Sequence, residues 1–184
     1  LGTSDNSFEA ISWDEGMEPV RSSEPDWLFI FGVSESRVPP IAEALGVPVI
    51  AIQGLFRSAS PGFDALDRFS TFFVRHPLPI RPGERLKRTP ILLVGTAENV
   101  VVLSPDQTDL DEKVQSRLAS IDDKTPRILR ATLALIGEIL SAYTDVTDSM
   151  EIRLANLEVA QTYLDDETFL DRTIELRADI LKVR

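Results

Sequence analysis

The chain has 184 residues, of which 43% are hydrophobic, and its 30 acidic and 19 basic residues give a formal net charge of −11. A chain of this size can bury one sizeable core, but its negative charge repels phosphates, so we expect no nucleic-acid partner. The absence of cysteine excludes disulfides and thiolate metal sites. No run of 18 apolar residues is present, so we predict no membrane span within this sequence.

The first 105 residues alternate short β-rich runs with glycine and proline, a pattern typical of an α/β arrangement. The last two of these runs are separated by a short connection, which favours an antiparallel hairpin. We predict strands at residues 8–14, 26–33, 69–76, 90–96 and 99–105.

Between these strands the sequence predicts two helices and a loop. A helix is expected at residues 34–45, because Pro39 and Pro40 suit its beginning and Gly46 can end it. Residues 46–56, GVPVIAIQGLF, predict a short buried helix. Residues 56–66 are interpreted as a glycine- and proline-containing loop, which lacks the Gly-Lys-Ser ending of a phosphate-binding loop.

The last part of the chain has helical periodicity. Residues 109–119 predict an amphipathic helix, and a second, long helix is expected to follow Pro126 and to reach about residue 163. A third helix, at residues 168–184, would complete an antiparallel helical hairpin. The long helix carries apolar residues at three- and four-residue steps, predicted to form one packing stripe: Leu129, Leu133, Ile136, Leu140, Tyr143, Val146, Met150, Leu154 and Leu157.

The order of these elements resembles the cytoplasmic domain of CorA-type divalent cation transporters, including their ZntB branch. The segments that carry the resemblance are WLFIFGVSE, GVPVIAIQGLF, FSTFFV, ILLVGTAENVVVLS, LALIGEILSAYTDVTDSMEIRLANLE and FLDRTIELRADILKVR. The resemblance implies an α/β (α+β) fold in which a mixed β-sheet is sandwiched by helices and followed by a long helical hairpin. It divides the chain into an α/β domain, residues 1–124, and a hairpin, residues 125–184, that leads toward a stalk and membrane helix beyond this sequence.

The resemblance also implies partners and a location. In the complete protein we expect a homopentamer in the cell membrane, with this domain on the cytoplasmic side and membrane contact only through the C-terminal segment that follows. Divalent cations, namely magnesium, cobalt or zinc, are the implied ligands, and no other cofactor is expected.

Two pairs of positions depart from the family's pattern. Relatives commonly read Gly-X-His-Pro-Leu-X-Leu-Glu-Asp-X-Leu over residues 46–56, where the acidic pair contributes to divalent sites between subunits; this chain has Gln53 and Gly54 there. Relatives also often have an acidic pair before a tyrosine on the first long helix, where this chain has Ser141 and Ala142 before Tyr143. Because hard cations prefer carboxylate oxygens, these changes predict that magnesium sensing at the family's intersubunit site is weakened or absent.

Two acidic groups remain as candidate cation sites. Asp145, Asp148 and Glu151 follow one another at single-turn spacing on the long helix, where the alternative is a solvated helix face. Asp165 and Asp166, followed by Glu167, are placed at the tip of the hairpin, where the alternative is a solvated acidic turn.

Three other features of the sequence have more than one interpretation. We expect His76, the only histidine, to have a surface or loop role, with a metal or pH function as the alternative. The basic residues between 75 and 88 could meet a neighbouring subunit, lipid headgroups or acids of their own chain, and we favour the last. Trp13 and Trp27 are interpreted as packing residues of strands.

We do not expect an enzyme, since no Gly-X-Ser-X-Gly motif is present and a Ser-His-Asp triad would depend on His76 alone. Two functions remain open. One is a regulatory and assembly domain of a CorA-type transporter that gates through subunit packing. The other is a soluble interaction module that binds a partner through its helical hairpin.

Overall fold

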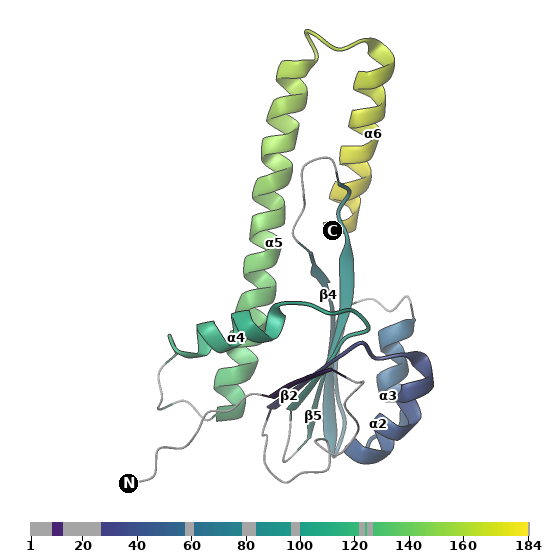
Figure 1. Cartoon of the computed structure of the whole chain (residues 1–184), viewed down its shortest axis with the longest axis vertical. Helices are drawn as coiled ribbons and strands as arrows, with labels where there is room; N and C mark the ends of the chain where they lie inside the picture. Colours follow the sequence, from purple (N-terminus) through teal and green to yellow (C-terminus); the bar gives the residue numbers. More distant parts are fainter. Residues whose placement is uncertain are drawn as a thin grey trace. The chain divides into compact units, whose positions relative to one another are not determined.

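The computed structural model describes residues 9–12, 27–57, 61–78, 84–96, 100–121, 124 and 127–183 (Figure 1). The chain packs as two units. Unit 1 comprises Leu1–Arg75 with Thr89–Glu138, and unit 2 comprises His76–Arg88 with Ile139–Arg184. The division at residues 124 and 125 that the resemblance implied stays a prediction.

The sheet is mixed and has six strands in the order β1-β2-β6-β5-β4-β3. β1 pairs with β2 and β2 with β6 in parallel, whereas β6 pairs with β5 and β4 with β3 in antiparallel fashion. The predicted hairpin of β5 and β6 is confirmed, with Leu92 opposite Leu103 and Gly95 opposite Val100. The strands are β1 (Glu9–Ser12), β2 (Trp27–Phe31), β3 (Gly62–Ala65), β4 (Phe69–Pro77), β5 (Arg88–Thr96) and β6 (Val100–Leu103).

Two short helices cover one face of the sheet in unit 1 (Figure 1). A 3-10 turn, η2 (Glu35–Arg37), leads into α2 (Val38–Leu45), which ends at Gly46 with a left-handed φ of 64°. The helix α3 (Val49–Gln53) follows and continues as the 3-10 turn η3 (Gly54–Phe56). Ile41, Ile52 and Leu55 from these elements join a buried cluster with side chains of β2, β4, β5 and β6. Both predicted helices are therefore present, but α3 is not the buried helix that was predicted, because Ile52 is buried whereas Val49 and Ile50 are exposed.

The opposite face of the sheet is covered by α4 (Leu110–Leu118) and by the first part of α5 (Arg127–Ala160) (Figure 1). Strand side chains alternate between faces, so Phe29 and Phe31, whose rings stack at 6.0 Å, point away from the cluster that contains Leu28 and Ile30. The buried residues of α4 are Leu110, Val114 and Leu118, as its periodicity predicted.

The helical hairpin consists of the later part of α5 and of α6 (Asp166–Val183). In unit 2 a second apolar cluster joins Leu86 to residues of both helices. The predicted packing stripe of α5 is only partly correct: Val146, Met150 and Leu157 are buried, but Leu129, Leu133, Leu140 and Leu154 are exposed. At the beginning of α5 the buried positions are instead Ala131, Ala134 and Leu135.

The loop predicted at residues 56–66 was wrong in part, because it contains the edge strand β3, all four residues of which are exposed. Trp13 lies outside the described residues, as does the side chain of Trp27. Within the ranges that the structure describes, no helix is both long enough and apolar enough to cross a bilayer. The predicted fold class, a mixed sheet between helices followed by a helical hairpin, is confirmed.

Candidate functional site

Residues 46–56, where the sequence resemblance implied an acidic pair, carry no charged side chain at the two positions concerned. The side-chain oxygen of Gln53, at the end of α3, accepts a hydrogen bond of 2.9 Å from Nη2 of Arg57 one turn later. Gly54 begins η3 in an ordinary right-handed conformation, with φ at −53°. The amide of Gln53 is thus engaged locally, and Gly54 supplies only backbone.

The three acidic candidates on α5 are exposed. Asp145, Asp148 and Glu151 lie on the solvent side of the hairpin helix. Across the described residues, no three histidine, cysteine, aspartate or glutamate side chains gather as a metal would require. Asp145, Asp148 and Glu151 therefore stay candidates by sequence only.

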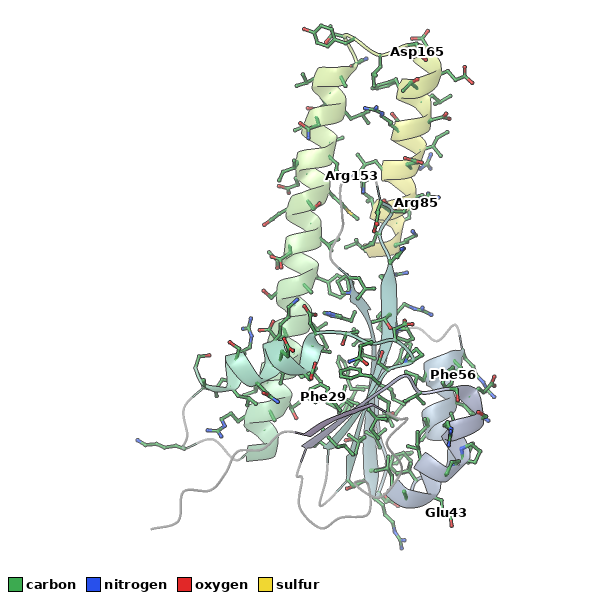
Figure 2. All side chains as sticks on the ribbon, viewed as in Figure 1. Phe29, Glu43, Phe56, Arg85, Arg153 and Asp165 are labelled. Carbon is green, nitrogen blue, oxygen red and sulfur yellow. The ribbon has the colours of Figure 1, made fainter. Side chains whose placement is uncertain are left out.

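Asp165 has a local structural role at the turn between α5 and α6 (Figure 2). Its Oδ1 accepts a hydrogen bond of 2.9 Å from the backbone N–H of Thr168, and its Oδ2 accepts one of 2.9 Å from the Thr168 hydroxyl. These two bonds hold the pKa of Asp165 below its ordinary value, and the bond from the backbone of Thr168 has the larger effect. Asp165 therefore caps the beginning of α6, which occupies both of its oxygens, while Asp166 and Glu167 are exposed in the first helical turn.

His76 is buried, so the predicted surface role was wrong. Only 2% of this residue is exposed. The strand β4 extends through Pro77, one residue beyond the predicted end, and His76 therefore lies inside the strand rather than at its tip.

The main polar cluster of unit 2 centres on Asp179 of α6. The side chain of Asp179 has no exposed surface. Its Oδ2 lies 2.9 Å from Nη1 of Arg153 on α5, and its Oδ1 lies 3.3 Å from Nζ of Lys182 and 4.0 Å from Nε of Arg85. We call Arg85, Arg153, Asp179 and Lys182 the Asp179 cluster.

The Asp179 cluster also fixes the chain before β5. Lys182 donates from Nζ to the carbonyl of Leu86 at 2.9 Å, and Arg88 donates to the carbonyl of Lys182. Among the three interpretations of the basic segment, the contacts of Arg85 and Arg88 favour the balance of acids and carbonyls within one chain. Arg81 is outside the described residues.

Two opposing effects set the pKa of Asp179. Burial, the larger single effect, disfavours the carboxylate and acts to raise the pKa. Hydrogen bonds from Arg153, from the backbone of Leu86 and from Lys182 together outweigh it, so the pKa of Asp179 lies below its ordinary value. The carboxylate is therefore ionised at neutral pH and holds three cationic side chains around it.

Sequence reasoning missed the Asp179 cluster. Its only local signal is the three-residue spacing between Asp179 and Lys182, which is common on helix surfaces. Arg153 and Arg85 are 26 and 94 residues from Asp179 along the chain, so only the fold brings them together. The cluster contains no pair of nucleophile and general base. Its role is the electrostatic stabilisation of a buried carboxylate by cationic side chains.

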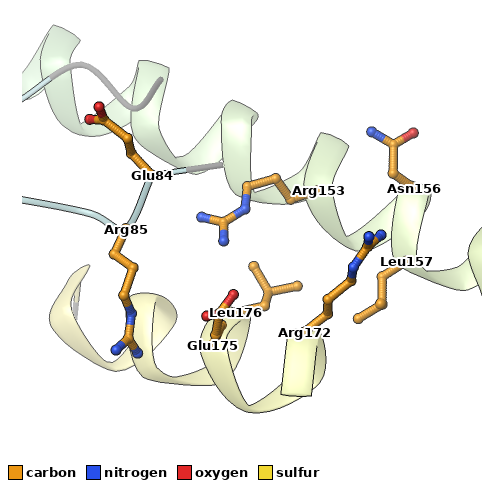
Figure 3. A pocket seen from close by; sticks show the side chains of 8 residues that line it. All are labelled: Glu84, Arg85, Arg153, Asn156, Leu157, Arg172, Glu175 and Leu176. Carbon is orange, nitrogen blue, oxygen red and sulfur yellow. The ribbon is translucent and has the colours of Figure 1, made fainter. Parts of the chain in front are cut away.

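A pocket of about 380 Å³ lies beside this cluster (Figure 3). Its walls come from α5, α6 and the residues that precede β5. Arg153 extends from α5 and Arg172 from α6 into the space between the two helices (Figure 3). The pocket is thus lined by three arginines, Arg85 being the third, although the chain as a whole is strongly acidic.

Comparisons with known proteins give a likeness of fold. No protein-family model and no curated protein matches the sequence. The soluble domain of CorA from Methanocaldococcus jannaschii superposes with a TM-score of 0.66 at 15% identity, over 84% of this chain and 62% of that one. The complete CorA magnesium transporter of the same organism superposes with a TM-score of 0.65 at 14% identity, over 84% of this chain and 49% of that one. The ZntB cytoplasmic domain from Vibrio parahaemolyticus superposes with a TM-score of 0.57 at 16% identity, over 82% of this chain and 62% of that one.

The chain thus has the fold of the CorA and ZntB cytoplasmic domains, as the sequence resemblance predicted. It spans about half to three-fifths of the length of these structures. None of the three is described as an enzyme.

Proposed function

We propose that this chain is the cytoplasmic regulatory and assembly domain of a CorA-type divalent cation transporter. The observation that carries the proposal is the match of 84% of the chain to the CorA soluble domain, with a TM-score of 0.66. Function is carried over from the fold by analogy.

In this proposal the complete protein is a homopentamer in the cell membrane, and the described domain lies on the cytoplasmic side. The cargo is magnesium, cobalt or zinc. The membrane part would follow the C-terminus of α6, as the sequence resemblance implies. Two apolar runs of 18 or more residues after Arg184 in the reading frame are the expected result. An early stop codon after Arg184 would contradict the proposal.

The proposed gating is electrostatic. Between residues 145 and 171 the hairpin carries eight acidic residues against Arg153 alone. Copies of this surface repel one another, and divalent cations near the subunit boundaries reduce the repulsion. Loss of the cations would loosen the ring of subunits and open the attached pore. Because Gln53 and Gly54 offer no carboxylate, this member would depend on diffuse attraction of cations more than on a specific intersubunit site.

Thermal unfolding with magnesium, zinc or cobalt chloride tests this proposal, with light scattering to follow the assembled mass. Ionic strength is held fixed so that only ion-specific effects remain. A ligand that binds the folded form raises the unfolding midpoint. We expect a small, similar rise for all three ions and no oligomer of the 184-residue chain. A large rise for one ion together with oligomer formation would contradict diffuse binding and indicate a specific site.

A second function is favoured by the exposed apolar side chains of the hairpin. Leu140, Ile152 and Val159 on α5 and Leu170 and Ile174 on α6 are each more than half exposed. Ile152 and Val159, seven residues apart, share one face of α5, and Leu170 and Ile174 share one face of α6. Such exposed apolar faces suit a partner helix, so the chain could be an interaction module that binds a protein through its hairpin. Replacing Leu140 and Ile152 with Gln would then abolish binding of that partner while leaving the unfolding midpoint unchanged.

A further inference from the structure

The pocket beside the Asp179 cluster concentrates positive charge in an acidic protein. Its polar lining comes from Glu84, Arg85, Arg153, Asn156, Arg172 and Glu175. At about 380 Å³ it is within the size range of small-molecule sites. Its lining has three arginines against two glutamates, in a chain whose formal charge is −11.

The three arginines of this pocket differ in whether they already have an ion-pair partner. Arg153 is held in place by its 2.9 Å contact with the buried Asp179. Arg85 lies 4.0 Å from the same carboxylate, and its side chain keeps 54% of its exposure. Arg172 has no hydrogen-bond or ion-pair partner among the residues the structure describes, even though Glu175 is three residues further along α6. Arg85 and Arg172 therefore have donors available toward the pocket.

Guanidinium groups match the geometry of oxyanions. Each presents several N–H donors in a planar fork that can bind phosphate or carboxylate through two parallel bonds. A group held by a buried partner is also preorganised, because less side-chain entropy is lost when a ligand binds. Arg153 has this property through Asp179.

The remaining lining residues restrict the ligand further. Glu84 and Glu175 repel a bare anion but accept hydrogen bonds, and Asn156 can both donate and accept. A ligand that satisfies all of them needs an oxyanion at the arginines and hydroxyl donors for the carboxylates. We propose that this pocket binds a small phosphorylated polyol, its phosphate at Arg85, Arg153 and Arg172. This inference does not depend on the transport proposal.

Calorimetric titration of the 184-residue chain tests the site, with glycerol 3-phosphate, inorganic phosphate and glycerol as probes at fixed ionic strength. We expect both phosphate compounds to bind, glycerol 3-phosphate more tightly, and glycerol alone to give no binding. Arg172→Met should lower the affinity for both phosphate compounds about tenfold or more, because charge-assisted hydrogen bonds are lost. Absence of binding by both phosphate compounds would overturn the proposal.

Arg177→Met is the matched control, since Arg177 is also an exposed arginine of α6 but does not line the pocket. It should leave both affinities unchanged, and neither variant should shift the unfolding midpoint in phosphate-free buffer. Equal weakening by Arg177→Met would mean a general charge effect and would overturn the site. Glu175→Leu tests the contacts to the polyol hydroxyls. It should strengthen the binding of inorganic phosphate and reduce the preference for glycerol 3-phosphate over inorganic phosphate. An unchanged preference would refute the hydroxyl contacts.

Discussion

Asp179 is the residue on which the charge balance of the hairpin most depends. A fully buried carboxylate is costly unless it is ionically paired and hydrogen-bonded. Here Arg153, Lys182 and the backbone of Leu86 meet that requirement, and the two cations keep part of their exposure to water. Removing the central charge would leave three positive groups near one another without their shared counter-ion.

We therefore expect Asp179→Asn to destabilise the chain. The amide has nearly the same shape but no charge, so the cost is the loss of charge-assisted bonds, about 1.5 to 3 kcal/mol. Urea unfolding at pH 7 measures this change in the free energy of unfolding. Asp171→Asn is the control, because Asp171 is an exposed carboxylate on the same helix and should change stability little. Equal stability of the two variants would show that the cluster contributes nothing net.

The pH dependence of stability follows from the same residue. Folding lowers the pKa of Asp179, so the ionised form favours the folded state. This contribution is fully present above the unfolded-state pKa, near pH 4, and is lost as pH falls through the lower folded-state pKa. The difference in unfolding free energy between the wild type and Asp179→Asn should be constant from pH 7 to about pH 5 and shrink below pH 4. Denaturant titrations at several pH values measure it. A difference that grows on acidification would reverse the assigned sign.

Among the helices, α4 and α5 show how one missing side chain permits a contact. Arg117 of α4 forms an ion pair with the partly buried Glu138 of α5. The guanidinium passes over Gly137, where an added Cβ would lie 2.9 Å from Nη1 and 3.0 Å from Cδ of Arg117. A glycine within a helix ordinarily lowers stability by about 1 kcal/mol relative to alanine. At Gly137 this loss is accompanied by the space that lets Arg117 reach Glu138.

A double-mutant cycle checks whether Gly137 and Arg117 are coupled in this way. In an Arg117→Ala background, Gly137→Ala should stabilise the chain by about 1 kcal/mol, which is the helix-propensity gain. In the wild-type background that gain should be largely lost, because the new methyl group displaces Arg117 from Glu138. The coupling, measured by urea unfolding of the four proteins, should be about 1 kcal/mol. Additive effects would mean that Arg117 moves aside without cost.

Most helices and strands were predictable because their signals are local. Proline near the beginning and glycine at the end delimited α2, and the three apolar residues of α4 alone defined its buried face. The stripe of α5 was misjudged at its beginning. Periodicity identifies a helix face but not what covers it, and small Ala131 and Ala134 allow close packing where the larger Leu129 and Leu133 stay exposed.

The polar cluster was not predictable for a different reason. Its members come from α5, α6 and the chain before β5, and each is unremarkable within its own segment. Composition instead drew attention to the acidic run from Asp145 to Asp171. There Asp165 serves as a helix cap, a role that the sequence Asp-Asp-Glu-Thr is suited to and that a motif search for metal ligands would overlook.

For the molecule as a whole, the fold is similar to that of the CorA soluble domain, whereas the acidic pair that the sequence resemblance implied is absent. The CorA soluble domain is similar in fold over 84% of this chain, but the uncharged Gln53 and Gly54 stand where the sequence resemblance implied an acidic pair. Gly54 has a right-handed conformation, and a Cβ there would meet nothing within 4 Å. The backbone at this position therefore accommodates an acidic side chain.

Restoring the pair, Gln53→Glu with Gly54→Asp, should raise the magnesium-dependent stability of an assembled form of the complete protein. Two carboxylates supply the hard oxygen ligands that magnesium prefers. The measurement is the unfolding midpoint with and without magnesium, with light scattering to report the assembly. Gln53→Asn with Gly54→Ser is the neutral control and should show no magnesium response. No response of the acidic variant in the assembled protein would contradict the inherited-site interpretation.

The exposed edge strand β3 bears on how concentrated this protein can become. No strand that the structure describes pairs with its outer side, and Phe63 is 64% exposed there. An open edge with an aromatic side chain is a template for aggregation by strand addition. Asp64 is the only charge on β3, and it would face like charge if two such edges met. Resistance to aggregation at this edge thus rests on one carboxylate, which makes position 64 a poor choice for charge-removing surface engineering.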